Sequence, residues 1–200
     1  PSVSANTPKM DYNDVFHGNC IQGYVGYATN KKIRQESQSG GIVTALLCYL
    51  LNTNVIDGAI VNQFNTKTRR PQASFKDSIE GIRDCSGSYY AQSSVVEEIL
   101  KHQDKRMAAV VLGCQGECIN LIKNKYPEIV LPEYLIGLIC AGQYSGNYID
   151  QIINETGCSR NEVTSFRFRD TGVGGWPGHT RVETTENEYV VHEAIRKSLK

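Results

Sequence analysis

Residues 107–140 read MAAVVLGCQGECINLIKNKYPEIVLPEYLIGLIC, and this stretch decides the fold class. The apolar runs Met107 to Leu112 and Tyr134 to Ile139 each predict a short strand, because they are rich in β-prone residues and bounded by polar segments. Between them, helical spacing from about Glu117 to Lys125 predicts a helix. An alternation of strand, helix and strand is typical of α/β proteins.

The same alternation continues on both sides of this stretch. The further strands we expect are 23–28, 57–63 and 163–168, and the further helices are 40–51, 76–85, 93–102 and 145–155. The helix over 40–51 is apolar on nearly every face and should be buried. After residue 170, glycines and prolines predict loops. We therefore expect an α/β fold with a single mixed, largely parallel sheet, flanking helices and a loop-rich C-terminal part.

The length and the two ends of the sequence set the expected domain organisation. Two hundred residues with an ordinary apolar fraction are enough to bury one core. We expect an N-terminal extension or linker over 1–22, one α/β domain over 23–185, and a C-terminal segment over 186–200 that continues into a longer chain.

Charge and hydropathy exclude several classes of partner. The 21 basic and 21 acidic residues give a formal net charge of zero and are scattered along the chain, which argues against a nucleic-acid partner. No run approaches the roughly 20 apolar residues of a membrane span, and the start lacks the pattern of a signal peptide. We therefore expect a cytoplasmic protein.

The first candidate site precedes the apolar helix. The segment from Ser37 to Gly41 leads directly into this helix, so that free backbone N–H groups and the positive end of the helix dipole lie beside two hydroxyls. This arrangement is typical of phosphate or flavin binding. The alternative is that Ser39 only caps the helix and that the glycines permit close packing.

The second candidate site is a set of three cysteines. Seven cysteines, an odd number, fit reduced thiols and metal ligands better than a disulfide framework. Cys114 and Cys118 follow one predicted strand and Cys140 follows the other, so parallel strands would bring them to one edge of the sheet. Thiolates suit an iron–sulfur cluster, which normally has four ligands, or a zinc ion.

The cysteine pattern leaves the fourth ligand open. Cys20, Cys85 or a segment beyond residue 200 could supply it, and a structural zinc site could use Cys85 or His179. A free cysteine is also a common small buried hydrophobe, which is the role we expect of Cys48.

The third candidate site joins the segment from Phe166 to Asp170 to a glycine-rich loop that contains Trp176 and His179. Its arginines and aromatic rings could hold an anionic cofactor. The alternative is an ordinary strand with exposed arginines and buried phenylalanines, followed by a turn.

Taken in order, these segments resemble the coenzyme F420 hydrogenase/dehydrogenase beta-subunit family, from about Gly23 to Trp176. The residues 34–41, continuing through 43–47 and 56–58, resemble the family's arginine and Ser-Gly-Gly helix start. The stretch 87–93 is similar to the family's Gly-Ser-Lys-Tyr segment, although Tyr89 stands at the lysine position.

The resemblance continues through the cysteine-containing segments. Residues 113–115 resemble the family's Gly-Thr-Pro-Cys-Gln turn without its Thr-Pro, and Cys118 is an additional cysteine there. Residues 137–140 resemble Gly-Leu-Phe-Cys, and Phe166-Arg167 with Gly175-Trp176 resembles a Phe-Arg and Gly-Trp segment.

The resemblance implies a flavin-dependent electron-transfer oxidoreductase subunit with FAD and a [4Fe-4S] cluster. It would pass electrons between the cluster and a two-electron carrier such as coenzyme F420, with a redox partner subunit or a ferredoxin-like donor. No catalytic side chain is expected, because the flavin carries the hydride chemistry. The alternative is a non-catalytic, cofactor-binding scaffold that keeps the fold and docks redox or biosynthetic partners.

The resemblance also assigns candidate site residues. The expected cofactor-binding residues are Arg34, Ser37, Ser39, Gly40, Gly41, Thr44, Gly87, Ser88, Tyr90 and Gln115. The expected metal ligands are Cys114, Cys118 and Cys140.

Overall fold

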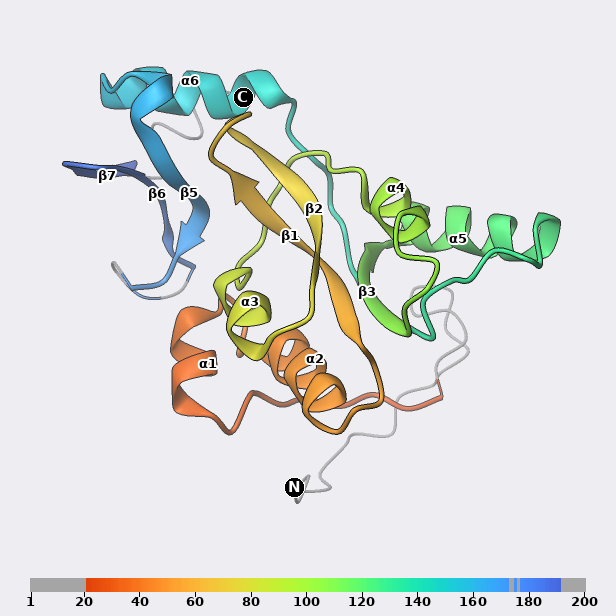
Figure 1. Cartoon of the computed structure of the whole chain (residues 1–200). Coiled ribbons are helices and arrows are strands. Elements are labelled where there is room, and N and C mark those ends of the chain that lie inside the picture. The colour runs from red at the N-terminus through yellow and green to blue at the C-terminus, as the bar shows by residue number, and fades with distance from the viewer. Residues whose placement is uncertain (1–20, 173–174, 176, 192–200) are drawn as a thin grey trace.

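The computed structural model describes residues 21–172, 175 and 177–191, which form two β-sheets with helices around them (Figure 1). The helices are α1 (Lys31–Glu36), α2 (Ile42–Asn52), α3 (Ile79–Asp84), α4 (Val95–Leu100), α5 (Gly113–Lys125), α6 (Gly146–Thr156) and the short 3-10 helix η1 (Arg160–Glu162). The strands are β1 (Gly58–Asn65), β2 (Arg70–Lys76), β3 (Met107–Leu112), β4 (Tyr134–Leu138), β5 (Val163–Asp170), β6 (His179–Thr184) and β7 (Glu188–Val191).

The first sheet is mixed, with the strand order β2-β1-β3-β4. Strand β3 runs parallel to both of its neighbours, β1 and β4, whereas β2 forms an antiparallel hairpin with β1. The predicted mixed, largely parallel sheet is therefore confirmed. Parallel pairing brings the carboxyl ends of β1, β3 and β4 to one edge of the sheet.

Helices cover both faces of β1 and β3. Because successive strand residues point to opposite faces, Ile60 packs with Ile99 of α4 on one face. Its neighbour Ala59 packs with Leu47 of α2 and Ile82 of α3 on the other face. All five of these side chains are at most 2% exposed. Burial on both faces explains the continuous apolar run of β3 and the apolar first half of β1.

The second sheet is antiparallel, in the order β5-β6-β7, and packs with α6. Phe166, Phe168 and Val182 are fully buried in its core together with Ile149 and Ile152 of α6. We expected a single sheet and a loop-rich C-terminal part, and the structure instead forms this second sheet there. Strand β6 is mainly polar and β7 has only four residues, so their apolar pattern was too weak to predict them.

Two local predictions were wrong, and a third gave a helix that is too long. Residues 23–28 form no strand, and Val25 is 97% exposed. The apolar helix α2 is not buried on every face, because Leu46 and Tyr49 are exposed. The region 76–85 holds the end of β2 and only a short helix, α3, which begins after its N-cap residue Ser78. The helix is therefore confirmed in a shorter form, and only Lys76 of the predicted range belongs to the hairpin strand.

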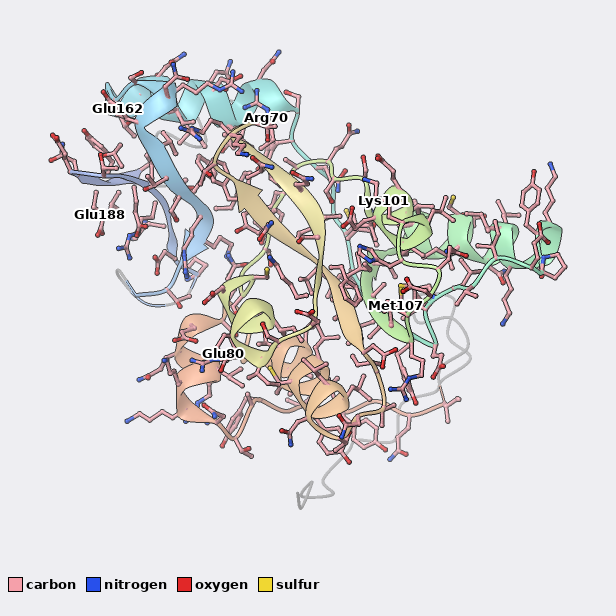
Figure 2. All side chains as sticks on the ribbon, viewed as in Figure 1. Arg70, Glu80, Lys101, Met107, Glu162 and Glu188 are labelled. Atoms are coloured by element: carbon pink, nitrogen blue, oxygen red, sulfur yellow. The ribbon has the colours of Figure 1, made fainter. Side chains whose placement is uncertain are left out.

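A bidentate ion pair links the first sheet to α6, the helix that packs with the second sheet. Arg70 stands at the start of β2 beside α6 (Figure 2), and its Nη1 and Nη2 atoms donate to the Asp150 carboxylate at 3.0 and 2.6 Å. No helix in the described part of the chain has the length and apolar character that crossing a membrane requires. Of the expected N-terminal extension, residues 1–20 lie outside the described residues, as do 192–200 of the C-terminal segment.

Candidate functional site

A large pocket of about 980 Å³ lies at the carboxyl edge of the parallel strands. Its wall includes Asn62 of β1, Val111 of β3 and Leu138 of β4, together with the start of α2 and the segment 85–91. Open α/β sheets bind their ligands at this edge. The volume is at the upper end of the roughly 300–1,000 Å³ of ligand pockets, so the site can take an extended cofactor.

The pocket brings together most of the predicted site residues. Eight of the ten expected cofactor-binding residues line it: Ser37, Ser39, Gly41, Thr44, Gly87, Ser88, Tyr90 and Gln115. Arg34 and Gly40 do not line it. The Arg34 guanidinium instead donates to the Ala28 carbonyl at 2.9 Å and lies 4.9 Å from the centre of the Tyr27 ring.

The glycines before α2 pack closely against their neighbours, and the first backbone N–H groups of this helix have no side-chain cap. Gly40 and Gly41 have φ values of +77° and +76°, and a Cβ on Gly41 would lie 3.0 Å from both Ile33 Cγ2 and Ser37 Oγ. These glycines are therefore required by backbone conformation and close packing. The N-cap residue is Gly41, with no side-chain hydrogen bond, so Ser39 does not cap the helix. The helix start faces the pocket through Thr44.

Three buried polar atoms that line the pocket have no hydrogen-bond partner among the described residues. They are Ser37 Oγ, Gln38 Oε1 and Asn62 Oδ1. A buried polar atom without a partner costs about 1–3 kcal/mol, so such atoms are rare unless a ligand satisfies them. The three atoms fit a ligand that carries both hydrogen-bond donors and acceptors.

Asn62 was missed in the sequence analysis. It lies in the middle of the strand sequence GAIVNQFN, residues 58–65, directly after the buried apolar residues of β1. A polar residue that interrupts the apolar run of a strand was the signal that could have identified it.

Two tyrosines hold the segment 87–91 against the second sheet. The Tyr90 hydroxyl accepts a hydrogen bond from Arg169 at 3.2 Å, and its ring meets Phe168 edge-on at 5.5 Å. The Tyr90 carbonyl accepts from the Tyr144 N–H at 2.6 Å. Burial raises the pKa of the Tyr89 phenol, and the nearby Arg167 charge partly offsets this effect. The pocket wall is therefore fixed by contacts from two separate segments, β5 and the residues that precede α6.

Gln115 has a structural partner as well as a place in the pocket wall. Its Oε1 accepts a hydrogen bond from the Leu112 N–H at 2.9 Å, which closes the junction between β3 and α5. This bond orients the Gln115 side chain at the carboxyl edge of β3, where it lines the large pocket.

The three predicted metal ligands are all exposed. Cys114 and Cys118 lie on the first turns of α5 and do not line the large pocket, whereas Cys140 follows β4 and does. The described residues contain no group of three or more His, Cys, Asp and Glu side chains arranged to hold a metal ion. The ligand assignment of these three cysteines therefore stays a prediction.

The candidates for a fourth ligand have different surroundings. Cys85 is buried at the end of α3 and lines the pocket, and burial raises the pKa of its thiol, which favours the neutral form. His179 is half-buried in β6. Cys48 is half-buried and packs against the core, as expected of a small hydrophobe. Cys20 and Trp176 lie outside the described residues.

The segment 166–170 has the pattern of an ordinary strand on one face and lines a cavity on the other. Phe166 and Phe168 are fully buried, whereas Arg167 and Arg169 alternate with them. Both arginines line a second, smaller pocket of about 310 Å³ that adjoins the large one. The structure therefore supports the alternative of a half-buried strand and adds a polar cavity beside it.

Two family models match this chain over nearly its whole length, and both describe the beta subunit of coenzyme F420 hydrogenase/dehydrogenase. The model of the N-terminal part of that protein matches residues 23–101, and the model of its C-terminal part matches residues 104–198.

Several curated proteins are similar in sequence. The coenzyme F420-dependent sulfite reductase of Methanocaldococcus jannaschii is 29% identical over 67% of this chain and 24% of its own length. The F420-dependent formate dehydrogenase 1 subunit beta of Methanococcus maripaludis is 27% identical over 60% of this chain and 31% of its own length. The coenzyme F420 hydrogenase subunit beta of Methanosarcina barkeri is 29% identical over 71% of this chain and 52% of its own length. The matched part thus spans between about a quarter and a half of these relatives.

A solved structure shares the fold. A chain of the xenon-derivatised F420-reducing [NiFe] hydrogenase complex from Methanosarcina barkeri superposes with a TM-score of 0.62. The match covers 87% of this chain and 62% of that chain, at 23% sequence identity.

Proposed function

The chain belongs to the coenzyme F420 hydrogenase/dehydrogenase beta-subunit family, and on that premise we propose that it is the flavin-binding part of an electron-transfer oxidoreductase subunit. The proposed reaction is the transfer of electrons between a one-electron donor and a two-electron carrier, with coenzyme F420 as the carrier. The names of the relatives support the carrier, because each of the three is F420-dependent or part of an F420 hydrogenase.

One observation carries the flavin proposal. The buried atoms Ser37 Oγ, Gln38 Oε1 and Asn62 Oδ1 lack partners among the described residues and line one large pocket. A hydroxyl that can donate and two amide oxygens that can accept match the mixed edge of a flavin ring, which presents both carbonyl oxygens and an N–H group. The residues present therefore fit a flavin.

The residues of the pocket would bind and orient the cofactor. The backbone N–H groups at the start of α2 have no side-chain cap and lie at the positive end of the helix dipole, where a phosphate is stabilised. The hydroxyls of Ser39 and Ser88 lie in the same wall and can donate hydrogen bonds. Apolar residues such as Leu47, Val61 and Ile82 would exclude water from the ring. A bound flavin would supply the hydride chemistry and the coupling to one-electron steps.

Fewer structural observations support an iron–sulfur cluster than support a flavin. Cys114 and Cys140 lie at the same edge of the sheet, since β3 and β4 are parallel neighbours. A [4Fe-4S] cluster needs four ligands, and the described residues do not gather three of the predicted thiols into a ligand group. The described residues therefore do not fit a cluster by themselves, and we derive no electron-transfer step through one.

The partner that we propose is a redox subunit or a ferredoxin-like donor. The solved structure with the same fold belongs to a multi-subunit hydrogenase complex, and two of the curated relatives are named as subunits. The exposed apolar side chains beside the pocket include Ile42 and Ile139, which are 40% and 103% exposed and give a partner a surface to contact.

A visible spectrum of the anaerobically purified, full-length natural protein tests the function, together with its flavin, iron and acid-labile sulfide content. Flavin absorbance that bleaches when reduced F420 is added supports the proposal. A colourless protein that takes up neither flavin nor iron on reconstitution would replace it with the non-catalytic scaffold.

A further inference from the structure

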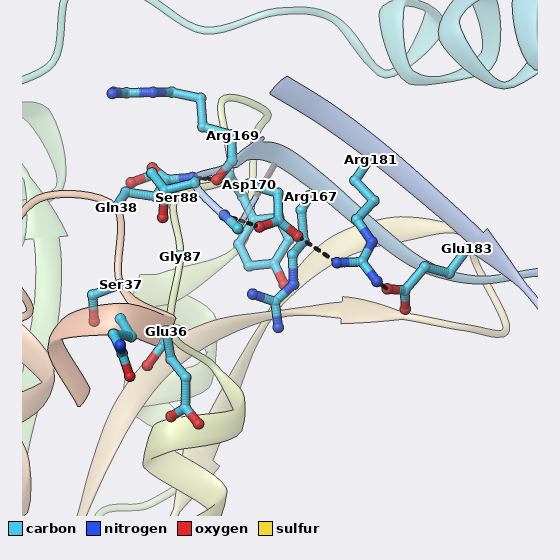
Figure 3. A pocket seen from close by; sticks show the side chains of 15 residues that line it. Glu36, Ser37, Gln38, Gly87, Ser88, Arg167, Arg169, Asp170, Arg181 and Glu183 are labelled. Atoms are coloured by element: carbon cyan, nitrogen blue, oxygen red, sulfur yellow. Dashed lines mark hydrogen bonds and ion pairs between the residues drawn. The ribbon is translucent and has the colours of Figure 1, made fainter. Parts of the chain in front are cut away.

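The smaller pocket of about 310 Å³ shares a wall with the large pocket (Figure 3). The residues that line both cavities include Ser37, Gln38, Gly87, Ser88, Tyr89 and Arg169. The shared wall is made of small or polar side chains and one glycine, so the two cavities adjoin without a layer of apolar core between them. A ligand larger than a ring system can therefore extend from one cavity toward the other.

The carboxylates that line the small pocket are already paired. Glu36 accepts from the Arg83 guanidinium at 3.0 Å. Asp170 and Glu183 both accept from Arg181, at 3.0 and 2.6 Å. Arg181 also pairs with Glu188 at the rim of this group. The acidic side chains of the pocket are thus neutralised by arginines other than Arg167.

Arg167 differs from the other arginines of the pocket. Within residues 21–172, 175 and 177–191, no hydrogen bond or ion pair joins its guanidinium to a carboxylate. Figure 3 shows the guanidinium in the pocket, apart from the dashed contacts that join Asp170, Arg181 and Glu183. The charge acts on Tyr89 in the shared wall, since it lowers a phenol pKa that burial raises. Within the described residues, Arg167 is therefore a cation with no carboxylate partner, and it lines the small pocket.

The position of Arg167 has a structural cost. It is the register partner of Arg181 on the neighbouring antiparallel strand, and like charges directly opposite each other destabilise a sheet. Arg181 has three carboxylate partners, whereas none of the described carboxylates pairs with Arg167. A ligand anion would offset this cost.

Other polar atoms of the small pocket also lack partners. Ser37 Oγ and Arg181 Nε are buried without a hydrogen-bond partner among the described residues, and both belong to side chains that line the cavity. The guanidinium N–H of Arg181 is a donor, so with Arg167 it suits an oxyanion, whereas the one hydroxyl hydrogen of Ser37 is assigned to the ring in the large pocket.

We propose that the small pocket is an anion subsite, in which Arg167 binds a phosphate or carboxylate group of the ligand whose ring occupies the large pocket. The guanidinium fork matches either oxyanion through two parallel hydrogen bonds. This inference rests on the proposed function for the identity of the ring. Two sources of the anion share this chemistry, namely the phosphates of the flavin nucleotide and the acidic side chain of the deazaflavin carrier.

Binding measurements on the full-length protein test the subsite. The variants are Arg167→Gln, which removes the charge, Arg167→Lys, which keeps the charge without the fork, and Lys67→Gln, which removes an exposed charge that lines neither pocket. The ligands are riboflavin, FMN and FAD in one series, and F420 with its tail-less deazaflavin ring in the other. Arg167→Gln should weaken one phosphate- or tail-bearing ligand by on the order of tenfold to a hundredfold and leave its uncharged ring compound within twofold of the native affinity.

The two series identify the source of the anion. A loss confined to FMN and FAD assigns the subsite to the flavin phosphates, and a loss confined to F420 assigns it to the carrier's acidic tail. Arg167→Lys should recover part of the loss, and Lys67→Gln should show none. Equal binding of charged and uncharged ligands by the native protein and by Arg167→Gln would overturn the subsite while leaving the flavin pocket intact.

If the proposed function is wrong, the binding measurements give a different result. In that case the native protein binds neither riboflavin nor the deazaflavin ring. Inorganic pyrophosphate is then the probe, because it needs no ring. Calorimetric binding by the native protein that Arg167→Gln abolishes supports the subsite on its own, and no difference between the two proteins overturns it.

Discussion

Leu112 of β3 and Leu138 of β4 are register partners in the parallel part of the sheet, and a cysteine follows each of them by two residues. Cys114 then enters the first turn of α5, whereas Cys140 enters the irregular segment that leads to Tyr144. The two cysteines therefore follow the same edge of the sheet at equivalent positions in the chain. The large pocket lies at this edge.

Replacing Cys114 with Ser tests the cluster assignment. If Cys114 is a ligand, the variant should lose most of its iron and the broad cluster absorbance while it keeps its flavin, because Cys114 does not line the flavin pocket. Iron and flavin are measured on the same anaerobic preparation. Cys158→Ser is the control, since Cys158 is a half-buried cysteine beyond the end of α6. Iron content equal to that of the native protein would remove Cys114 from the ligand set.

Flavin should protect one exposed thiol from alkylation. In metal-free protein, Cys114, Cys118 and Cys140 are all exposed, so each should react with iodoacetamide within a similar time. Of these three cysteines only Cys140 lines the large pocket, so added flavin should slow its alkylation at least several-fold. Peptide mass spectrometry gives the rate at each site. Buried Cys85, whose thiol pKa is raised by burial, should react slowly in both states. Equal protection of Cys118 and Cys140 would contradict the placement of the flavin.

Ser37→Ala separates ligand binding from stability. The Ser37 hydroxyl is buried without a partner among the described residues, so removing it should leave the stability of the unliganded protein unchanged or raise it by up to about 1 kcal/mol. The same change should weaken flavin binding by about threefold to tenfold, because one donor is lost. Urea unfolding and a flavin titration provide the two numbers. Ser74→Ala on β2, outside both pockets, should change neither. A variant that loses stability and keeps its flavin affinity would show that the Ser37 hydroxyl has only a structural role.

The long apolar runs predicted the centre of the fold well. Strand β3 matches its predicted bounds, because a strand buried between helices must be apolar on both faces. Strand β4 ends one residue earlier than predicted and is largely exposed, although its sequence is an apolar run. The mistakes lie where burial is one-sided or partial. Strand β6 has Val182 as its one large apolar residue, and residues 24–27 are apolar yet exposed. Local composition could not distinguish these two cases, since tertiary packing decides them.

The site was predictable to the extent that it follows from sheet topology. Parallel strands predicted that residues after β3 and β4 meet at one edge, and the structure confirms this. The roles of single side chains were less predictable. The Arg34 guanidinium donates to the nearby Ala28 carbonyl, and the Gln115 side chain accepts from Leu112 N–H at the start of α5. The missing partners of Asn62 and Arg167 depend on three-dimensional contacts, so no pattern in the sequence could show them.

Gly41→Ala tests how tightly the start of α2 is packed. Alanine at φ +76° is strained, and its Cβ would also lie only 3.0 Å from Ile33 Cγ2 and from Ser37 Oγ. We expect a loss of about 1–3 kcal/mol in the free energy of unfolding. Gly157→Ala is a matched control, because Gly157 has nearly the same φ of +73° and open space around its Cβ position. The difference between the two losses of unfolding free energy measures the cost of the contact with α1. Equal losses would show that backbone strain alone accounts for the need for glycine at position 41.

The ion pair between Arg70 and Asp150 predicts an acid-dependent loss of stability. The hydrogen bonds from Arg70 hold the pKa of Asp150 below its usual range. A depressed folded-state pKa stabilises the protein above the unfolded pKa of about 4, and this contribution is lost as the pH falls through the folded pKa. Asp150→Asn should therefore cost about 1 kcal/mol at pH 7, with both side chains less than a third exposed, and the difference should vanish well below pH 4.

Denaturant unfolding of the native protein and Asp150→Asn between pH 2 and pH 7 measures this difference. Asp104→Asn is the control, because its ion pair with Lys105 is more exposed and should matter less at every pH. The sign of the pH dependence is the decisive result, since a carboxylate stabilised by a guanidinium can only lose its contribution on the acid side. A difference that grew toward low pH would mean that neutral Asp150, and not its ion pair with Arg70, stabilises the junction between β2 and α6.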